Sequence, residues 1–172
     1  MRIIFDLDGV IRDLVSCTDK NINDIKEWDY FNVSVIDKNP ELILRCKPTE
    51  YYPIIKKFFN NQELIIYTHQ RESWKKYTES WCKKYLQRFK IYYFDSIEEK
   101  LNYLDSGDYL IEDYPFKNIL DKNIVLIDRP YNKSGKCKIR ILSPIGLKYF
   151  LIATSTEDKR VFSLSKSVEV NI

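Results

Sequence analysis

Five short, largely apolar runs recur along this chain, and segments with helical spacing separate most of them. The runs lie at residues 1–5, 63–67, 90–94, 109–111 and 123–127. A strand that is apolar at consecutive positions is buried on both faces, as in parallel sheets covered by helices. The pattern therefore predicts an α/β fold, a three-layer sandwich with a mostly parallel, Rossmann-like sheet.

Helical spacing is clearest between the second and third runs. Aromatic residues recur every three or four positions within residues 72–88, which predicts a helix with one aromatic face. These residues are Trp74, Tyr77, Trp81 and Tyr85. Shorter helices are expected at residues 23–31, 40–46, 50–60 and 98–104.

The length of 172 residues and the hydrophobic content of 44% suit a single domain with one core. We expect residues 1–172 to form that domain, with two additions. Residues 14–50 are polar and lack a long periodic pattern, which indicates a small cap insert. Residues 140–172 form a C-terminal extension that leaves the alternation, and its runs at 148–154 and 161–164 predict a β-hairpin.

Composition narrows the class of protein. No apolar run reaches the roughly 18–20 residues that span a bilayer, and the first residues do not resemble a signal peptide. The four cysteines are widely separated, so their spacing indicates neither a zinc site nor a disulfide framework. We expect a cytoplasmic protein with free thiols and no membrane partner.

The charge of the chain is uneven. The net charge is +3, but residues 133–172 hold eight Lys/Arg and three Asp/Glu, a local balance of +5. Such a region can bind nucleic acid, although a solvated surface is the commoner reason for it. Nucleic acid therefore stays one alternative partner.

Polar residues stand at the carboxyl ends of four of the five runs. They are Asp6, Asp8, Thr68, Glu112, Asp113 and Asp128. Open α/β sheets bind ligands outside the carboxyl ends of their strands, so we expect these side chains to share one site. We also expect Asp128 and Arg129 to brace either that site or the loop that carries them, through a mutual ion pair.

The turn after the first run carries the chemistry. Asp6 and Asp8 stand two residues apart, and Gly9 permits a tight bend and the close approach of a ligand. One carboxylate can attack phosphorus while the other protonates the leaving oxygen and then activates water. Because phosphate and carboxylates repel one another, a hard cation such as Mg²⁺ would offset the charge, with Asp113 as a further oxygen ligand.

Four segments in this order resemble the motifs of the haloacid dehalogenase-like hydrolase superfamily. They are Phe5–Val10, Ile65–Thr68, Lys100 and Leu110–Asp113. The resemblance covers about residues 1–132 and implies a Mg²⁺-dependent phosphatase that works through an aspartyl-phosphate intermediate.

The resemblance implies a role for each matching residue. Asp6 would be the nucleophile and Asp8 the general acid and base. Thr68 would donate a hydrogen bond to a phosphoryl oxygen, and Lys100 would neutralise it, with Lys83 and Lys84 as alternatives to Lys100. The implied metal ligands are Asp6, Asp8 through its backbone carbonyl, Asp113, and Glu112 either directly or through a water molecule.

Within the superfamily the chain looks most like the 5′(3′)-deoxyribonucleotidase group, through Glu112–Pro115, Leu126–Asn132 and the tryptophan-bearing helix. This implies a small phosphorylated substrate, a nucleoside monophosphate. Four residues are candidate substrate contacts: Arg12, Trp28, His69 and Gln70. Trp28 and its aromatic neighbours could stack on a base or simply pack the cap, and His69 could equally be a surface residue.

Three other functions stay open. One is a phosphatase for another small phosphoester, and one is a polynucleotide 3′-phosphatase served by the basic C-terminal region. The third is a non-enzymatic module that binds nucleic acid or protein, which the intact acids argue against.

Overall fold

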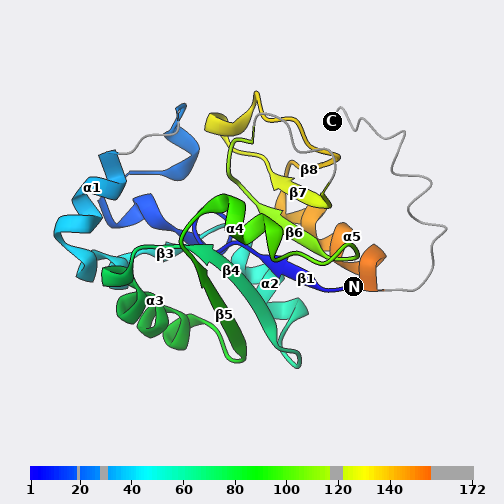
Figure 1. Cartoon of the computed structure of the whole chain (residues 1–172), viewed down its shortest axis with the longest axis horizontal. Helices are drawn as coiled ribbons and strands as arrows, with labels where there is room; N and C mark the ends of the chain where they lie inside the picture. Colours follow the sequence, from blue (N-terminus) through cyan, green and yellow to red (C-terminus); the bar gives the residue numbers. More distant parts are fainter. Residues whose placement is uncertain (19, 28–30, 117–121, 156–172) are drawn as a thin grey trace.

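The computed structural model describes residues 1–18, 20–27, 31–116 and 122–155, and within them a six-stranded parallel sheet forms the centre (Figure 1). Its strands are β1 (Ile3–Phe5), β4 (Leu64–His69), β5 (Phe89–Phe94), β6 (Tyr109–Glu112), β7 (Ile124–Ile127) and β8 (Ile139–Ile141). The five predicted strands are all present, and the predicted α/β sandwich is confirmed. β8 was not predicted.

Strand β1 lies inside the sheet, whose order is β5-β4-β1-β6-β7-β8. The chain builds outward from β1 through β4 to β5, then returns to the other side of β1 and adds β6, β7 and β8 (Figure 1). The direction of winding therefore reverses between β1 and β6, where Phe5 lies opposite Ile111. A crevice at such a reversal is where sheets of this type bind ligands.

Helices cover both faces of the sheet. The described α-helices are α1 (Phe31–Lys38), which belongs to the segment of residues 14–50, and α2 (Tyr52–Phe58), α3 (Glu72–Tyr85), α4 (Ile97–Asn102) and α5 (Pro144–Ser155), which pack on the sheet. Side chains of α2, α3 and α5 share one core with strand residues such as Phe5 and Ile66. Ile4 and Tyr67 point to the other face and pack in a second core, which α4 borders. Because consecutive strand residues face opposite cores, each strand needs apolar side chains at successive positions.

The segment of residues 14–50, called the insert below, is closed at its base by a short antiparallel pair, β2 (Arg12–Asp13) and β3 (Lys47–Pro48). Its described elements are α1 and the 3₁₀ helices η1 (Leu14–Thr18), η2 (Ile22–Asp24) and η3 (Pro40–Arg45). The helix predicted at 40–46 is thus present as a 3₁₀ helix, and the one predicted at 23–31 is wrong over residues 25–27. Residues 28–30, including the candidate contact Trp28, lie outside the described residues.

The predicted C-terminal β-hairpin is wrong over residues 148–154, which lie in α5. Ser143 stands before this helix, where its hydroxyl accepts a hydrogen bond from the Gly146 N–H (3.3 Å), and Pro144 occupies the first turn. The buried residues recur at helical rather than alternating spacing: Leu147, Phe150, Leu151 and Thr154. The second predicted hairpin strand, residues 161–164, lies outside the described residues. No described helix has the length and apolar character to cross a bilayer.

Candidate metal and phosphate site

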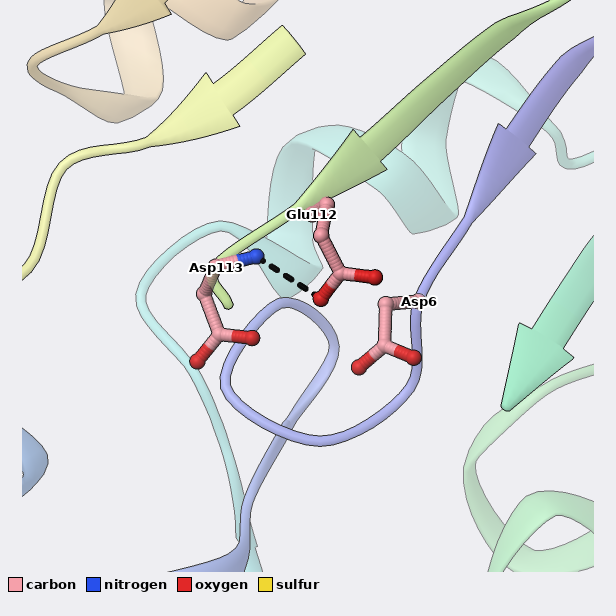
Figure 2. Close-up of side chains that lie close together, drawn as sticks. All are labelled: Asp6, Glu112 and Asp113. Atoms are coloured by element: carbon pink, nitrogen blue, oxygen red, sulfur yellow. Dashed lines mark hydrogen bonds between the residues drawn. The ribbon is translucent and has the colours of Figure 1, made fainter. Parts of the chain in front are cut away.

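Three buried carboxylates meet at the carboxyl ends of β1 and β6 (Figure 2). Asp6 is the first residue after β1, Glu112 is the last residue of β6, and Asp113 follows it. One carboxylate oxygen from each residue lies within 4.8 Å of the others. The structure therefore brings together three of the predicted metal ligands, at the point where the winding of the sheet reverses.

Lys100 lies between two of these acids. It belongs to α4, a helix that begins after Ser96, whose hydroxyl accepts a hydrogen bond from the Glu99 N–H (3.0 Å). The Lys100 Nζ donates to Asp6 Oδ1 and to Glu112 Oε2, the latter at 2.5 Å. The side chain is only 1% exposed, so its charge is balanced by these two carboxylates rather than by water.

Glu112 uses both of its carboxylate oxygens within the protein. Oε2 accepts from Lys100, and Oε1 accepts from the backbone N–H groups of Asp113 (3.0 Å) and Tyr114 (3.2 Å). Oε1 therefore holds the turn after β6, and its hydrogen bond from the Asp113 N–H is the dashed line in Figure 2. Asp6 and Asp113 are consequently better placed than Glu112 to offer oxygen atoms to a cation.

Gly9 makes the close approach of Asp113 possible. Its φ of 82° lies in the left-handed region that favours glycine. A Cβ atom at this position would overlap the carboxylate of Asp113. The glycine of the turn is thus needed both for its backbone conformation and for the room that it leaves to a neighbouring acid.

Replacing Gly9 by alanine should therefore destabilise the fold by about 1–3 kcal/mol from backbone strain alone, with a further cost from the displacement of Asp113. Urea unfolding of the two proteins measures the difference. Gly107→Ala is the matched control, because the nearest atom to a Cβ there would be 3.9 Å away. Equal stability of Gly9→Ala and the unmodified protein would contradict the described packing of the turn.

Burial and neighbouring charges shift the pKa values of the ionisable groups in the cluster. Burial and the charge of Glu112 raise the pKa of Asp6 to about 8, with Lys100 opposing the shift. Burial and the charges of Glu112 and Asp6 likewise raise the pKa of Asp113 well above its usual value. Burial lowers the pKa of Lys100, but the two adjacent carboxylates outweigh it and the net pKa is raised.

When all four groups are ionised, three carboxylates and one ammonium leave an excess of two negative charges in a buried space. A divalent cation would balance this excess and favour the ionised carboxylates. The ligand atoms on offer are carboxylate oxygens, which Mg²⁺ prefers. The residues present therefore fit Mg²⁺, which Asp6 and Asp113 would hold through their side chains.

Asp8 faces a separate group of polar side chains. Arg12 donates from Nε to Asp8 Oδ1 (2.6 Å) and from Nη2 to Oδ2 (2.9 Å), and Gln70 Nε2 donates to Oδ2 (2.7 Å). The Thr78 hydroxyl accepts from Arg12 Nη1 (3.1 Å) and donates to Gln70 Oε1 (2.7 Å). Arg12 also stacks on Trp81, with 5.5 Å between its Cζ and the ring centroid. Arg12 and Gln70 are buried in these contacts and hold Asp8, and contact of either residue with a substrate stays a prediction.

The remaining candidates lie at different places. Thr68 is buried near the carboxyl end of β4, which pairs with β1, so it lies at the same end of the strands as Asp6. His69 is the last residue of β4 and is exposed. Lys83 and Lys84 are exposed in the last turn of α3, which runs back toward the start of β5. Among the three lysines considered, the structure places Lys100 at the acids.

The ion pair expected between Asp128 and Arg129 is wrong. Arg129 is fully buried and donates from Nε and Nη2 to the carbonyl oxygen of Gly9 (3.2 and 2.7 Å). Its Nη1 donates to Glu50 Oε1 (2.6 Å) and Asn23 Oδ1 (3.1 Å) in the insert. Arg129 thus joins the turn after β1 to the insert, whereas Asp128 pairs with Lys133 and Arg140.

The arrangement offers a buried carboxylate in contact with a buried ammonium, oxygen ligands for a hard cation, and a second carboxylate two residues along the same turn. These are groups from which a phosphoryl-transfer site can be built. No family model and no curated protein matches the chain.

Proposed function

We propose that this protein is a Mg²⁺-dependent phosphatase that transfers a phosphoryl group first to Asp6 and then to water. The observation that carries the proposal is the contact of Lys100 with Asp6 and Glu112 beside Asp113, at the reversal point of the sheet. The order of the four segments that resemble the haloacid dehalogenase-like superfamily supports it independently.

In the proposed reaction, an oxygen of Asp6 attacks the phosphorus of the ester, and the bond to the leaving oxygen breaks. Asp8 gives its proton to the leaving oxygen. Asp8 later takes a proton from the water that attacks the phosphorylated Asp6, which releases phosphate and restores both carboxyl groups. Both oxygens of Asp8 accept hydrogen bonds from Arg12 or Gln70, which hold the carboxylate in the turn after β1.

In this proposal, groups around Asp6 balance the negative charge of the phosphoryl group. In the proposed site Lys100 would neutralise a phosphoryl oxygen, and the Thr68 hydroxyl would donate a hydrogen bond to it from the neighbouring strand. Mg²⁺ held by Asp6 and Asp113 supplies positive charge that offsets the repulsion between the acids and the phosphate. For the substrate we propose a nucleoside monophosphate, on the resemblance of Glu112–Pro115 and Leu126–Asn132 to the deoxyribonucleotidase group.

A panel of phosphoesters tests this function. With Mg²⁺ present, phosphate release should be fastest from deoxyribonucleoside monophosphates, slower from sugar phosphates and slowest from 3′-phosphorylated oligonucleotides. Excess chelator should abolish release, and added Mg²⁺ should restore it, because the acidic cluster repels phosphate without a cation.

Other outcomes of the panel point elsewhere. Equal rates on sugar phosphates would contradict the nucleotide preference, and a preference for the oligonucleotides would indicate a polynucleotide 3′-phosphatase. Full activity in chelator would remove the role of the metal. No release from any ester would contradict phosphatase activity itself.

A further inference from the structure

The loop that follows β7 directs three side chains to the turns that follow β1 and β6. Its residues Pro130–Asn132 form a 3₁₀ helix, η4, preceded by Arg129. Arg129 donates to the carbonyl oxygen of Gly9, as described above. The Tyr131 hydroxyl donates to Asp113 Oδ2, and Asn132 Nδ2 donates to the carbonyl oxygen of Asp113 (2.8 Å).

Asp113 stands where the ladder of the sheet ends. The pairing of β6 with β7 stops at Glu112, which lies opposite Leu126. Beyond that pair, the side chain of Asn132 links the two segments, because its Nδ2 donates to the carbonyl oxygens of Asp113 and Ile127, each at 2.8 Å. The backbone of Asp113 is thereby tied to the end of β7 although it lies outside both strands.

The loop that makes these contacts is itself held in place. The Arg129 N–H donates to Asn132 Oδ1 (3.0 Å), and the Asn132 N–H donates to the carbonyl oxygen of Arg129 (3.1 Å). Arg140 of β8 adds a bond from Nη1 to Asn132 Oδ1 (3.0 Å). Asn132 is fully buried and Tyr131 is 9% exposed, so water does not compete for most of these contacts.

We propose that Tyr131 and Asn132 are positioning residues for the metal site: Asn132 fixes the backbone of Asp113, and Tyr131 fixes the rotation of its carboxylate. With Oδ2 bonded to the Tyr131 hydroxyl, the carboxylate keeps one orientation next to Asp6. Partners of this kind orient a ligand before the cation arrives, and their loss typically weakens metal affinity by about 10–100-fold. This inference rests on the proposed function, since it assumes that Asp113 is a ligand of Mg²⁺.

The variant Tyr131→Phe tests it, because it removes one hydroxyl and keeps the ring. Mg²⁺ binding to the full chain is measured by calorimetry without substrate, and activity is measured against Mg²⁺ concentration. We expect affinity to fall by roughly tenfold or more. At saturating Mg²⁺, kcat should recover to near that of the unmodified protein. Tyr149→Phe, at a position 67% exposed on α5, is the control that should change neither quantity.

Three results would overturn the inference. Unchanged Mg²⁺ affinity in Tyr131→Phe, with affinity lost in Asp113→Asn, would mean that Asp113 binds the cation without help from Tyr131. A fall in both affinity and kcat that tracks a lower unfolding midpoint of the metal-free variant would mean a purely structural role. Mg²⁺ affinity that Asp113→Asn leaves unchanged would contradict the proposed metal site, and this inference with it.

Discussion

Asp6→Asn should lower the rate of phosphate release by at least about 10⁴-fold, because an amide cannot replace a carboxylate as the nucleophile. The substitution keeps the size of the side chain, and Asp6 is 7% exposed, so packing changes little. The rate is measured on the best substrate of the panel at saturating Mg²⁺. Asp95→Asn, in the exposed turn between β5 and α4, is the matched control and should keep full activity.

The same variant should not lose stability. Burial and the charge of Glu112 raise the pKa of Asp6 above its value in the unfolded chain. As the pH rises past that unfolded value, the unfolded chain loses the proton of Asp6 before the folded protein does, so the free energy of unfolding falls. Asparagine avoids this cost, and the free energy of unfolding at neutral pH should be equal or higher. Turnover that survives in Asp6→Asn would remove Asp6 as nucleophile, and lost activity together with a lost fold would leave that role without support.

Lys100→Met should lower the free energy of unfolding by about 3–5 kcal/mol and abolish activity. Removing one partner of a buried ion pair leaves the other charge uncompensated, and here two carboxylates lose their shared cation. Because the pKa of Lys100 is raised, its ammonium is charged throughout neutral pH, where the loss should be complete. Urea unfolding at neutral pH without metal measures the effect.

Two further measurements make this test specific. Lys83→Met removes an exposed lysine of α3 and should leave stability and activity near those of the unmodified protein. Added Mg²⁺ should stabilise Lys100→Met more than the unmodified protein, because the acidic cluster then lacks its own cation. Unchanged stability of Lys100→Met would contradict the buried contacts described for this lysine.

The strands could be predicted where burial on both faces requires successive apolar residues. β8 escaped prediction because it is only three residues long and has Arg140 at its centre, whose guanidinium bonds to Asp128 and to the carbonyl oxygens of Asn132 and Gly135. The strand predicted at 148–154 is wrong for a different reason. Its apolar residues are dense enough to suggest a strand, and only their spacing, with Ser143 before Pro144, signals a helix.

The acids could be predicted because each stands at or just after the end of a recognisable strand, whereas the choice of Lys100 rests on the family resemblance, with Lys83 and Lys84 as alternatives. Their supporting residues could be predicted only in part: the sequence places Arg129 at the site, but with Asp128 rather than Gly9 and Glu50 as its partner. Arg129, Tyr131 and Asn132 lie more than 100 residues from Gly9, and packing alone brings them to it or to the neighbouring Asp113. A fully buried arginine is also unexpected from sequence, since arginine is rarely buried unless paired.

The sequence places Arg12 and Gln70 near the site, but their contacts with Asp8 could not be predicted from it. Reasoning from sequence treats each polar side chain alone. In the structure both are buried with Thr78 around Asp8, and hydrogen bonds among them satisfy donors that water cannot reach. Only the approach of α3 to the turn after β1 reveals this arrangement.

Trapping the phosphorylated protein tests directly whether Asp6 is the nucleophile. Tryptic cleavage after Arg2 and Arg12 yields residues 3–12, a peptide that holds both Asp6 and Asp8. The protein is quenched in acid during turnover of the best substrate, and fragmentation in a mass spectrometer locates any added phosphoryl group. We expect one phosphoryl group on Asp6, absent in Asp6→Asn and absent without Mg²⁺. Steady turnover with no phosphoryl group on this peptide, or with the group on another residue, would contradict it.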